Sequence, residues 1–356
     1  MGYEIDFLPV GDSNGDAICM RYGTPQTGYT IQVVDGGFTD TAKTVIDHVE
    51  THYGKGVTIN HMILSHADND HAMGLIGILN HFEVGAIWMN RPWLYADQCI
   101  DAFHSNYTLD GLIKRMRELH PYLVEIENIA NKRNIPIYEA FQGTNIGQFH
   151  VLAPSKQRYI SLIPELDKTP QSYIEQVASK GIGTIIADVL KEAREWVKEQ
   201  WGSETLADDL KTSASNETCL VQMGFFDDRR VVLTADVGPI GLIEAADYAQ
   251  MHNILAPPRM FQVPHHGSRH NVSRTALNRW LGDPLPQGSA NRGSAFCSVG
   301  KNKDDYPRRI VSNSFLRRGY PVHSTKGLAK RHSHDMPDRD GWSASDPAPF
   351  YEDVEG

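Results

Sequence analysis

The chain has 356 residues, of which 40% are apolar and 22% are charged, and its formal net charge at pH 7 is −10. This length and composition fit one large globular domain or two half-domains, and the negative charge argues against bulk, non-specific binding of polyanions. The apolar runs stay well below the roughly 20 residues of a membrane helix, and no signal-peptide pattern opens the sequence. The four cysteines have no paired spacing, as in free thiols of a reducing compartment. We therefore expect a cytoplasmic protein that does not contact a membrane.

Short strands and helices alternate through the first part of the chain. Tyr29 to Val34 is rich in β-branched residues and runs into the turn Asp35-Gly36-Gly37, so it predicts a strand. Val57 to Leu64 predicts another strand, Ala72 to Phe82 a short helix, and Gly85 to Met89 a third strand.

The next segment is helical and then extended. Leu109 to Asn134 carries apolar residues at helical spacing around Pro121, which predicts two helices or one kinked helix. Ile135 to Tyr138 and Phe149 to Leu152 predict strands.

Residues 155–213 differ from their surroundings, because they are charged and helix-forming. An apolar stripe from Ile186 through Trp196 and Val197 has helical spacing, with acidic and basic residues on the other side. We predict a helical insertion that packs on the core, and a substrate lid or a protein-docking surface is the alternative.

The C-terminal part predicts a second set of strands. Thr218 to Phe225 and Arg230 to Thr234 flank Phe226-Asp227-Asp228 as a hairpin, and two more strands and a helix follow, at Phe261 to Val263, Ala295 to Val299 and Pro307 to Arg318. Residues 336–356 are rich in Pro, Ser, Gly and acids, which predicts a flexible acidic tail. The pattern favours an α/β fold of stacked sheets covered by helices.

The densest chemical signal follows the strand that ends at Leu64. His66, Asp68, Asp70 and His71 place two imidazoles and two carboxylates within six positions. Alternate residues of an extended loop point the same way, and His71 turns inward at the start of the next helix. Such a cluster supplies nitrogen and oxygen ligands to two adjacent metal ions. A solvated polar loop is the bland alternative, but without a metal these groups would repel one another or stay protonated.

Two later segments offer the same kinds of ligand. Val231 to Leu233 is an apolar strand that leads to Asp236, and the strand at Phe261 to Val263 leads to His265 and His266. Taken alone, the acid is typical of a helix cap or a turn, and the histidine pair is typical of a polar loop. Together with the first cluster, they place metal-type ligands at the carboxyl ends of strands, where α/β proteins tend to build sites.

These motifs resemble the signature of the metallo-β-lactamase superfamily, in its variant with Asp at the second ligand position. Six segments, which follow one another along the chain, resemble more closely the hydrolase domain of the bacterial DNA-uptake competence protein, the ComEC-like group. Tyr306 and Ala235 stand where that group usually has His and Gly. The resembling segments are Phe7 to Ala17, Val34 to Gly37, His66 to His71, Asn216 to Val221 with Thr234 to Asp236, Pro264 to Ser268, and Ser298 to Asn302 with Tyr306-Pro307.

The resemblance implies a metallo-β-lactamase αββα sandwich over residues 1–335, with the helical insertion at 155–213 and the tail at 336–356. It further implies that His66 and Asp68 bind one metal, that Asp70 and His71 bind the other, and that Asp236 bridges them. Either His265 or His266 would complete the second site, since neighbouring residues of a strand point opposite ways. Asp35 would orient a metal-bound histidine. The third ligand of the first metal is not placed, and its candidates are His104, His120 and His150.

The implied mechanism needs no Ser or Cys nucleophile. Two divalent metals would lower the pKa of a bridging water to give hydroxide near neutral pH, with Asp70, Asp236 and His266 as catalytic residues. Because Asp68 replaces a histidine, Mn²⁺ competes with Zn²⁺ for the site. This difference, with the added length and the lack of a signal peptide, disfavours a true β-lactamase. A flavin-linked redox role is disfavoured because no flavodoxin-like extension is present.

The substrate is suggested by an uneven charge distribution. Residues 258–334 hold fourteen Lys and Arg and only three Asp, and they begin beside the histidine pair. A solvated helix face is the bland interpretation, and a phosphate-binding wall is the functional one. This basic region includes Arg259, Arg269, Arg274, Arg279, Arg308, Arg309, Arg317, Arg318, Lys330 and Arg331.

Three hypotheses follow. The first is a phosphodiesterase or nuclease acting on DNA or other nucleic acid, and analogy suggests an effector of a bacterial defence system. The second is a small-molecule or phosphocholine-type phosphodiesterase. The third is a partner-binding subunit of a multi-protein complex, with residues 155–213 as the docking surface.

Overall fold

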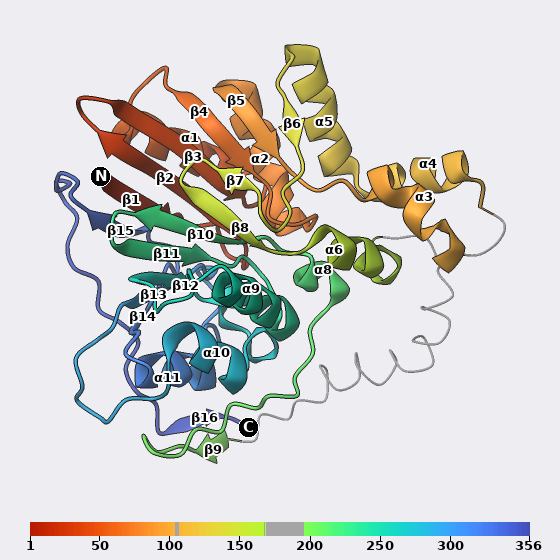
Figure 1. Cartoon of the computed structure of the whole chain (residues 1–356). Coiled ribbons are helices and arrows are strands. Elements are labelled where there is room, and N and C mark those ends of the chain that lie inside the picture. The colour runs from red at the N-terminus through yellow and green to blue at the C-terminus, as the bar shows by residue number, and fades with distance from the viewer. Residues whose placement is uncertain (104–106, 167, 169–195) are drawn as a thin grey trace.

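The computed structural model describes residues 1–103, 107–166, 168 and 196–356 (Figure 1). Its first sheet has the strand order β15-β1-β2-β3-β4-β5-β6, antiparallel from β15 to β3 and parallel from β3 to β6. Its strands are β1 (Gly2–Phe7), β2 (Ala17–Thr24), β3 (Gly28–Gly36), β4 (Thr58–Ile63), β5 (Glu83–Trp88), β6 (Ile137–Tyr138) and β15 (Lys330–His334).

The second sheet has the order β14-β13-β12-β11-β10-β8-β7, parallel from β14 to β11 and antiparallel from β11 to β7. The hairpin predicted around Asp227 is present, and Asp227 has a left-handed backbone there, with φ 55°. The strands are β7 (Asn145–Ile146), β8 (Phe149–Ala153), β10 (Val221–Phe226), β11 (Arg229–Leu233), β12 (Met260–Gln262), β13 (Ser294–Cys297) and β14 (Val322–Ser324).

Helices cover the outer face of each sheet (Figure 1). On the first sheet lie α1 (Thr41–His52), α2 (Asn69–His81) and α5 (Pro121–Arg133), and α4 (Leu109–Leu119) leads into α5 from beyond the edge of the sheet. Pro121 occupies the first turn of α5, so the segment is two helices. On the second sheet lie α9 (Pro239–Met251), α10 (Arg274–Leu281) and α11 (Arg309–Arg317). The short helices are α3 (Ala96–Cys99), α6 (Lys156–Leu162) and α8 (Ala214–Glu217).

Alternating side chains divide the core into three layers. In β1, Tyr3, Ile5 and Phe7 enter the apolar layer between the two sheets, where Phe226 and Phe296 of the second sheet also lie. The opposite faces of the sheets pack against their own helices. Because successive residues of a strand point to opposite faces, each buried sheet serves two layers at once. This is the αββα arrangement expected from the sequence.

The C-terminal segment packs on the domain, which corrects the expectation of a flexible tail. Strand β16 (Asp353–Glu355) pairs antiparallel with β9 (Trp196–Lys198), and the side chain of Val354 is fully buried. Earlier in the tail, Arg339 donates two hydrogen bonds of 2.8 Å to the buried carboxylate of Asp6. A composition typical of disorder is overridden by these specific pairings.

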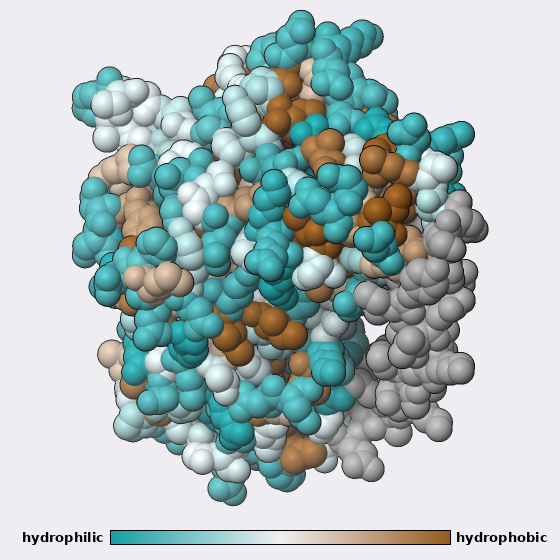
Figure 2. Space-filling view, turned by 45° about the vertical axis from the view of Figure 1, so that its right-hand side comes forward, coloured by the Kyte–Doolittle hydropathy of each residue, from teal (hydrophilic) through white to brown (hydrophobic). Residues whose placement is uncertain are grey.

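Only the borders of the 155–213 insertion can be compared with its predicted helices. Most of the apolar stripe, from Ile186 to Ala193, lies outside the described residues. Its last two residues, Trp196 and Val197, belong to β9, so the helical prediction is wrong there. In the part of the chain that the structure describes, no helix is long and apolar enough to cross a membrane. The face in Figure 2 is mostly hydrophilic, with apolar residues in separate groups.

Candidate metal centre

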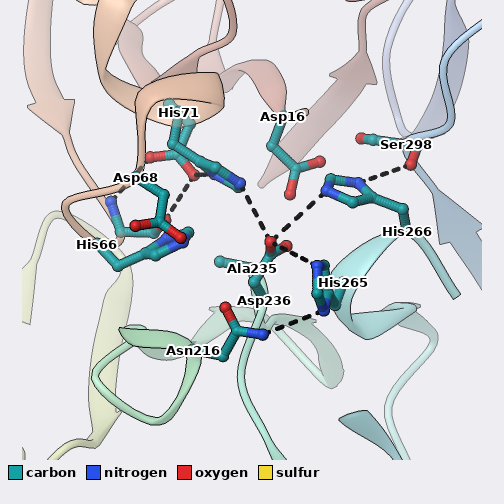
Figure 3. Close-up of polar contacts among 12 residues, drawn as sticks. Asp16, His66, Asp68, His71, Asn216, Ala235, Asp236, His265, His266 and Ser298 are labelled. Carbon is teal, nitrogen blue, oxygen red and sulfur yellow. Dashed lines mark hydrogen bonds and ion pairs between the residues drawn. The ribbon is translucent and has the colours of Figure 1, made fainter. Parts of the chain in front are cut away.

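The carboxyl ends of the parallel strands bring the predicted ligands to one edge between the sheets. The loop after β4 carries His66, and Asp68 stands just before the first turn of α2, which holds Asp70 and His71. From the second sheet, the segment after β11 carries Asp236, and the segment after β12 carries the histidine pair. The two sheets therefore contribute facing halves of one cluster (Figure 3).

Asp236 lies at the centre of the cluster. Its Oδ2 is 3.4 Å from Nε2 of His71, 3.6 Å from Nε2 of His265 and 3.5 Å from Nε2 of His266. Ligand atoms of His66, His71 and Asp236 all lie within 4.8 Å of one another, and so do those of Asp70, His71 and His266. The structure thus assembles groups that are far apart in the sequence.

Unpartnered buried atoms test whether this cluster suits a metal. Nε2 of His66, His71 and His266 and Oδ1 of Asp16 and Asp236 are all buried, and none has a hydrogen-bond partner. Buried polar groups are nearly always paired, since an unpaired one costs about 1–3 kcal/mol. Imidazole nitrogens and carboxylate oxygens that converge on one another are the donors that divalent metals bind. The residues present therefore fit a metal site.

The other nitrogen of each imidazole is held by the protein. Nδ1 of His71 lies 2.7 Å from Oδ2 of Asp35, which confirms the contact expected of Asp35. Nδ1 of His66 lies 3.0 Å from the hydroxyl of Ser65, and Nδ1 of His266 lies 2.9 Å from the carbonyl oxygen of Ser298. Such partners fix the ring orientation and direct Nε2 into the cluster.

Both residues of the histidine pair face Asp236, which the alternation of a strand would not allow. His265 and His266 have φ values of 46° and 58°, so they form a tight turn instead of extended strand. Ala235, just before Asp236, has φ 46°, and Asp35 has φ 58°. Left-handed non-glycine residues are strained and concentrate at functional sites. His266 is buried and His265 is partly exposed, so His265 lies nearer the solvent side.

The charged groups of the cluster shift one another's pKa values. Burial would lower the pKa of His266, but the carboxylate of Asp236 raises it to about 9. Burial would likewise raise the pKa of Asp236, but His266, His265 and His71 hold it well below its usual range. His266 thus holds a proton that a metal must displace, so metal affinity should rise with pH up to about 9.

Asp68 lies at the edge of the cluster. Its Oδ2 is 3.4 Å from Nε2 of His66, and its Oδ1 is 3.7 Å from Nζ of Lys168. His66 and Asp68 also line a small cavity of about 10 Å³ with His120. His120 is buried, its Nδ1 lies 2.8 Å from the carbonyl oxygen of Met116, and its Nε2 has no partner.

The three candidates for the third ligand of the first metal differ in where they lie. His120 faces the first-metal side of the cluster, although no group of close ligand atoms among the described residues includes it. His150 instead contacts Asn145 and stacks on Tyr248. His104 lies outside the described residues.

Sequence reasoning gave no role to Asp16. It is 1% exposed, and an oxygen of its carboxylate lies within 4.8 Å of ligand atoms of Asp35 and His71. It follows Gly15 just before a buried strand that is far from the other ligands in sequence. The sequence signal that could have indicated Asp16 is an acid that follows glycine directly before a strand.

Comparisons with known proteins give a family match and several similar structures. The sequence model of the metallo-beta-lactamase superfamily matches residues 26–140, which include the cluster from His66 to His71. A comparison with curated proteins finds no match. Similar solved structures include AbOPH, a hydrolase in the beta-lactamase superfamily, with 12% identity and a TM-score of 0.28 over 62% of this chain and 56% of that chain.

Two further structures are similar at the same low identity. A candidate metallo-beta-lactamase from Thermotoga maritima is 8% identical, with a TM-score of 0.34 over 71% of this chain and 86% of that one. CmlA, a diiron beta-hydroxylase from Streptomyces venezuelae, is 10% identical, with a TM-score of 0.35 over 92% of this chain and 46% of that one. Residues 26–140 therefore match the metallo-β-lactamase superfamily, and the two mixed sheets have that superfamily's α/β fold, with the His/Asp cluster at their common edge.

Proposed function

We propose that the protein is a hydrolase that holds two divalent metal ions, Zn²⁺ or Mn²⁺, and cleaves phosphodiester bonds, with nucleic acid as its substrate class. One observation carries the metal-dependent part, namely the five buried nitrogen and oxygen atoms that converge without a hydrogen-bond partner. When bound, paired divalent ions supply Lewis acidity and lower the pKa of a coordinated water.

The protein's own residues divide the remaining work. Asp236 lies between the histidines of the two sheets, so it is suited to hold both halves of the site together. Asp70 is partly exposed, whereas His71 and His266 beside it are buried. Asp70 is thus a carboxylate suited to orient a water that enters from solvent. The carbonyl oxygen of Ser298 keeps His266 pointed at the centre.

The basic region contributes less than its sequence implied. Arg317 and Arg318 are fully buried and pair with Glu199 and Glu204 at 3.0 and 2.7 Å. Arg279 pairs with Asp247, Arg331 with Glu4, and Arg274 with Asp208. Arg317 and Arg318 are buried too deeply to bind a phosphate backbone, so the expectation that these two belong to a phosphate-binding wall is wrong. The other three arginines already have an acidic partner in the fold.

Lysines beside the centre support a phosphate-containing substrate instead. The backbone N–H of Gly300 donates to the side chain of Asn14 at 3.0 Å, and Ser298 contacts His266, so the loop carrying Lys301 and Lys303 borders the site. Lys301 is exposed and Lys303 is partly exposed. Cations beside a metal centre favour a polyanionic substrate and bind it through its phosphates.

A charge-reversal experiment tests the nucleic-acid part. Lys301→Glu with Lys303→Glu should weaken DNA binding and reduce the salt slope by about 0.9 for each lost duplex phosphate contact. Lys55→Glu, at the opposite end of β4, is the matched control. Metal content and cleavage of a small chromogenic phosphodiester should not change in any variant. Unaltered DNA affinity in the double variant would contradict the proposal.

The internal pairing of the arginines favours a second candidate, a phosphodiesterase for small molecules. If the wild-type protein binds no DNA at low salt but cleaves the chromogenic phosphodiester, this candidate replaces the first. A partner-binding role for residues 155–213 concerns mostly residues outside the described part, and it remains a proposal.

A further inference from the structure

Asp16 lies opposite Asp236, between His71 and His266 (Figure 3). Its side chain comes from the loop between β1 and β2, a part of the chain that contributes no other group to the cluster of ligand atoms among the described residues. Its Oδ1 is buried and has no partner, whereas its Oδ2 accepts a hydrogen bond of 3.0 Å from Nε2 of Gln262. One oxygen is thus fixed, and the other is free to bind a ligand.

Gln262 is itself locked in one orientation. Its Oε1 accepts hydrogen bonds from the backbone N–H groups of Thr234 and Ala235, at 2.9 and 3.0 Å. Since the oxygen is used there, the amide NH₂ must face Asp16. The same side chain therefore orients Asp16 and braces the strained residue before Asp236.

The backbone also places Asp16 at the second half of the centre. The N–H of Asp16 donates to the carbonyl oxygen of Asp70 at 3.3 Å. A Cβ on Gly15 would lie 2.7 Å from that same oxygen, so only glycine allows this approach. The loop is thereby seated on the first turn of α2, next to His71.

We propose that Asp16 is an additional carboxylate ligand on the His71 and His266 side of the centre, positioned by Gln262, and that it selects for Mn²⁺ over Zn²⁺. The proposal rests on the proposed function, because it requires that the centre binds metal. Mn²⁺ prefers oxygen-rich sites, whereas Zn²⁺ is well satisfied by imidazole. Asp16 raises the number of carboxylates on this side from two, Asp70 and Asp236, to three, so it makes the site richer in oxygen.

The test measures metal binding directly. The full-length protein is stripped of metal with a chelator and titrated separately with MnCl₂ and ZnCl₂ by calorimetry, and bound metal is counted by mass spectrometry. Asp16→Asn keeps the shape and removes the anionic oxygen. Its affinity for Mn²⁺ at one of the two sites should fall at least about tenfold, with a clearly smaller loss for Zn²⁺. Asp12→Asn, an exposed acid of the same loop, should bind both metals as the wild type does.

Two further variants separate metal selection from folding. Gln262→Met has a similar length but no donor, so it should lower Mn²⁺ affinity while Asp16 remains. If Asp16→Asn fails to fold, Asp16→Glu must retain the preference for Mn²⁺ over Zn²⁺. Wild-type affinity for Mn²⁺ in Asp16→Asn, or equal losses for the two metals, overturns the proposal. A wild-type protein that binds no metal at all contradicts the proposed function itself.

Discussion

Asp35 shows at the scale of one residue how the protein prepares its centre. Its Oδ1 accepts a hydrogen bond of 2.8 Å from the backbone N–H of Ser65, and its Oδ2 accepts one of 2.7 Å from the hydroxyl of the same residue. Oδ2 also faces Nδ1 of His71. The carboxylate therefore fixes the loop and the ring together. It also stabilises a His71 whose Nδ1 carries the proton and whose Nε2 is free.

We predict that Asp35→Asn lowers metal affinity by roughly 10- to 100-fold. Asparagine tolerates the left-handed backbone of Asp35, so the change isolates the loss of the carboxylate. Calorimetric titration with metal measures the effect, and Asp40→Asn, an exposed acid just before α1, is the control. Unchanged affinity in Asp35→Asn would show that Asp35 does not orient a metal ligand.

The local cluster from His66 to His71 could be predicted from sequence because its members are close together along the chain. Asp16 could be singled out only as an acid in a Gly-Asp step before a strand, because nothing in its own segment indicates which distant strands it will face. The expectation that only one of His265 and His266 faces the site assumed an extended strand, in which neighbouring side chains point opposite ways. Both residues instead have positive φ values and form a turn, so both side chains face Asp236.

At the scale of elements, the arginines at the end of α11 act as structural anchors. The guanidinium of Arg317 pairs with Glu199 and also donates to the carbonyl oxygens of Gln200 and Trp201. It thereby ties α11 to the segment that follows β9. The sequence could not reveal this, because the partners are more than 100 residues away.

We predict that Arg317→Met destabilises the protein by about 3–5 kcal/mol, because it leaves Glu199 buried without its partner. Urea unfolding measures the loss, and Arg274→Met, whose pair with Asp208 is largely exposed, should cost at most about 1 kcal/mol. If Arg317→Met is as stable as the wild type but binds DNA more weakly, Arg317 contacts the substrate and is not a structural anchor.

The tail is attached through Asp6, and this attachment depends on pH. Burial would raise the pKa of Asp6, but His48 and Arg339 lower it from 3.8 to about 2. A carboxylate with a lowered folded-state pKa stabilises the fold above its unfolded pKa and loses that effect as the pH falls through the folded value.

The stability difference between wild type and Asp6→Asn should therefore change little between about pH 5 and 4 and shrink between about pH 4 and 2. Urea unfolding across this range measures it. A difference that grows toward acid would show that Asp6 gains no stabilisation from Arg339 and His48.

At the scale of the whole molecule, the four-layer arrangement followed from the alternation of short strands and helices, and Tyr29 to Val34 falls within β3 as predicted. Several strands, β1 and β9 among them, were not anticipated. In β1, buried Glu4 and Asp6 interrupt the apolar pattern, and their charges are matched by Arg331 and Arg339 from the far end of the chain. Long-range partners of this kind leave no local trace in a sequence.

The central claim is that two sheets assemble one metal centre around Asp236, and metal counting tests it most directly. The purified wild-type protein should hold close to two divalent ions per chain and cleave a chromogenic phosphodiester. Asp236→Ala should lose at least one ion together with that activity, while Asp247→Ala, on the surface of α9, should retain both. Full metal content in Asp236→Ala, or a wild-type protein that binds no divalent metal, would contradict the account.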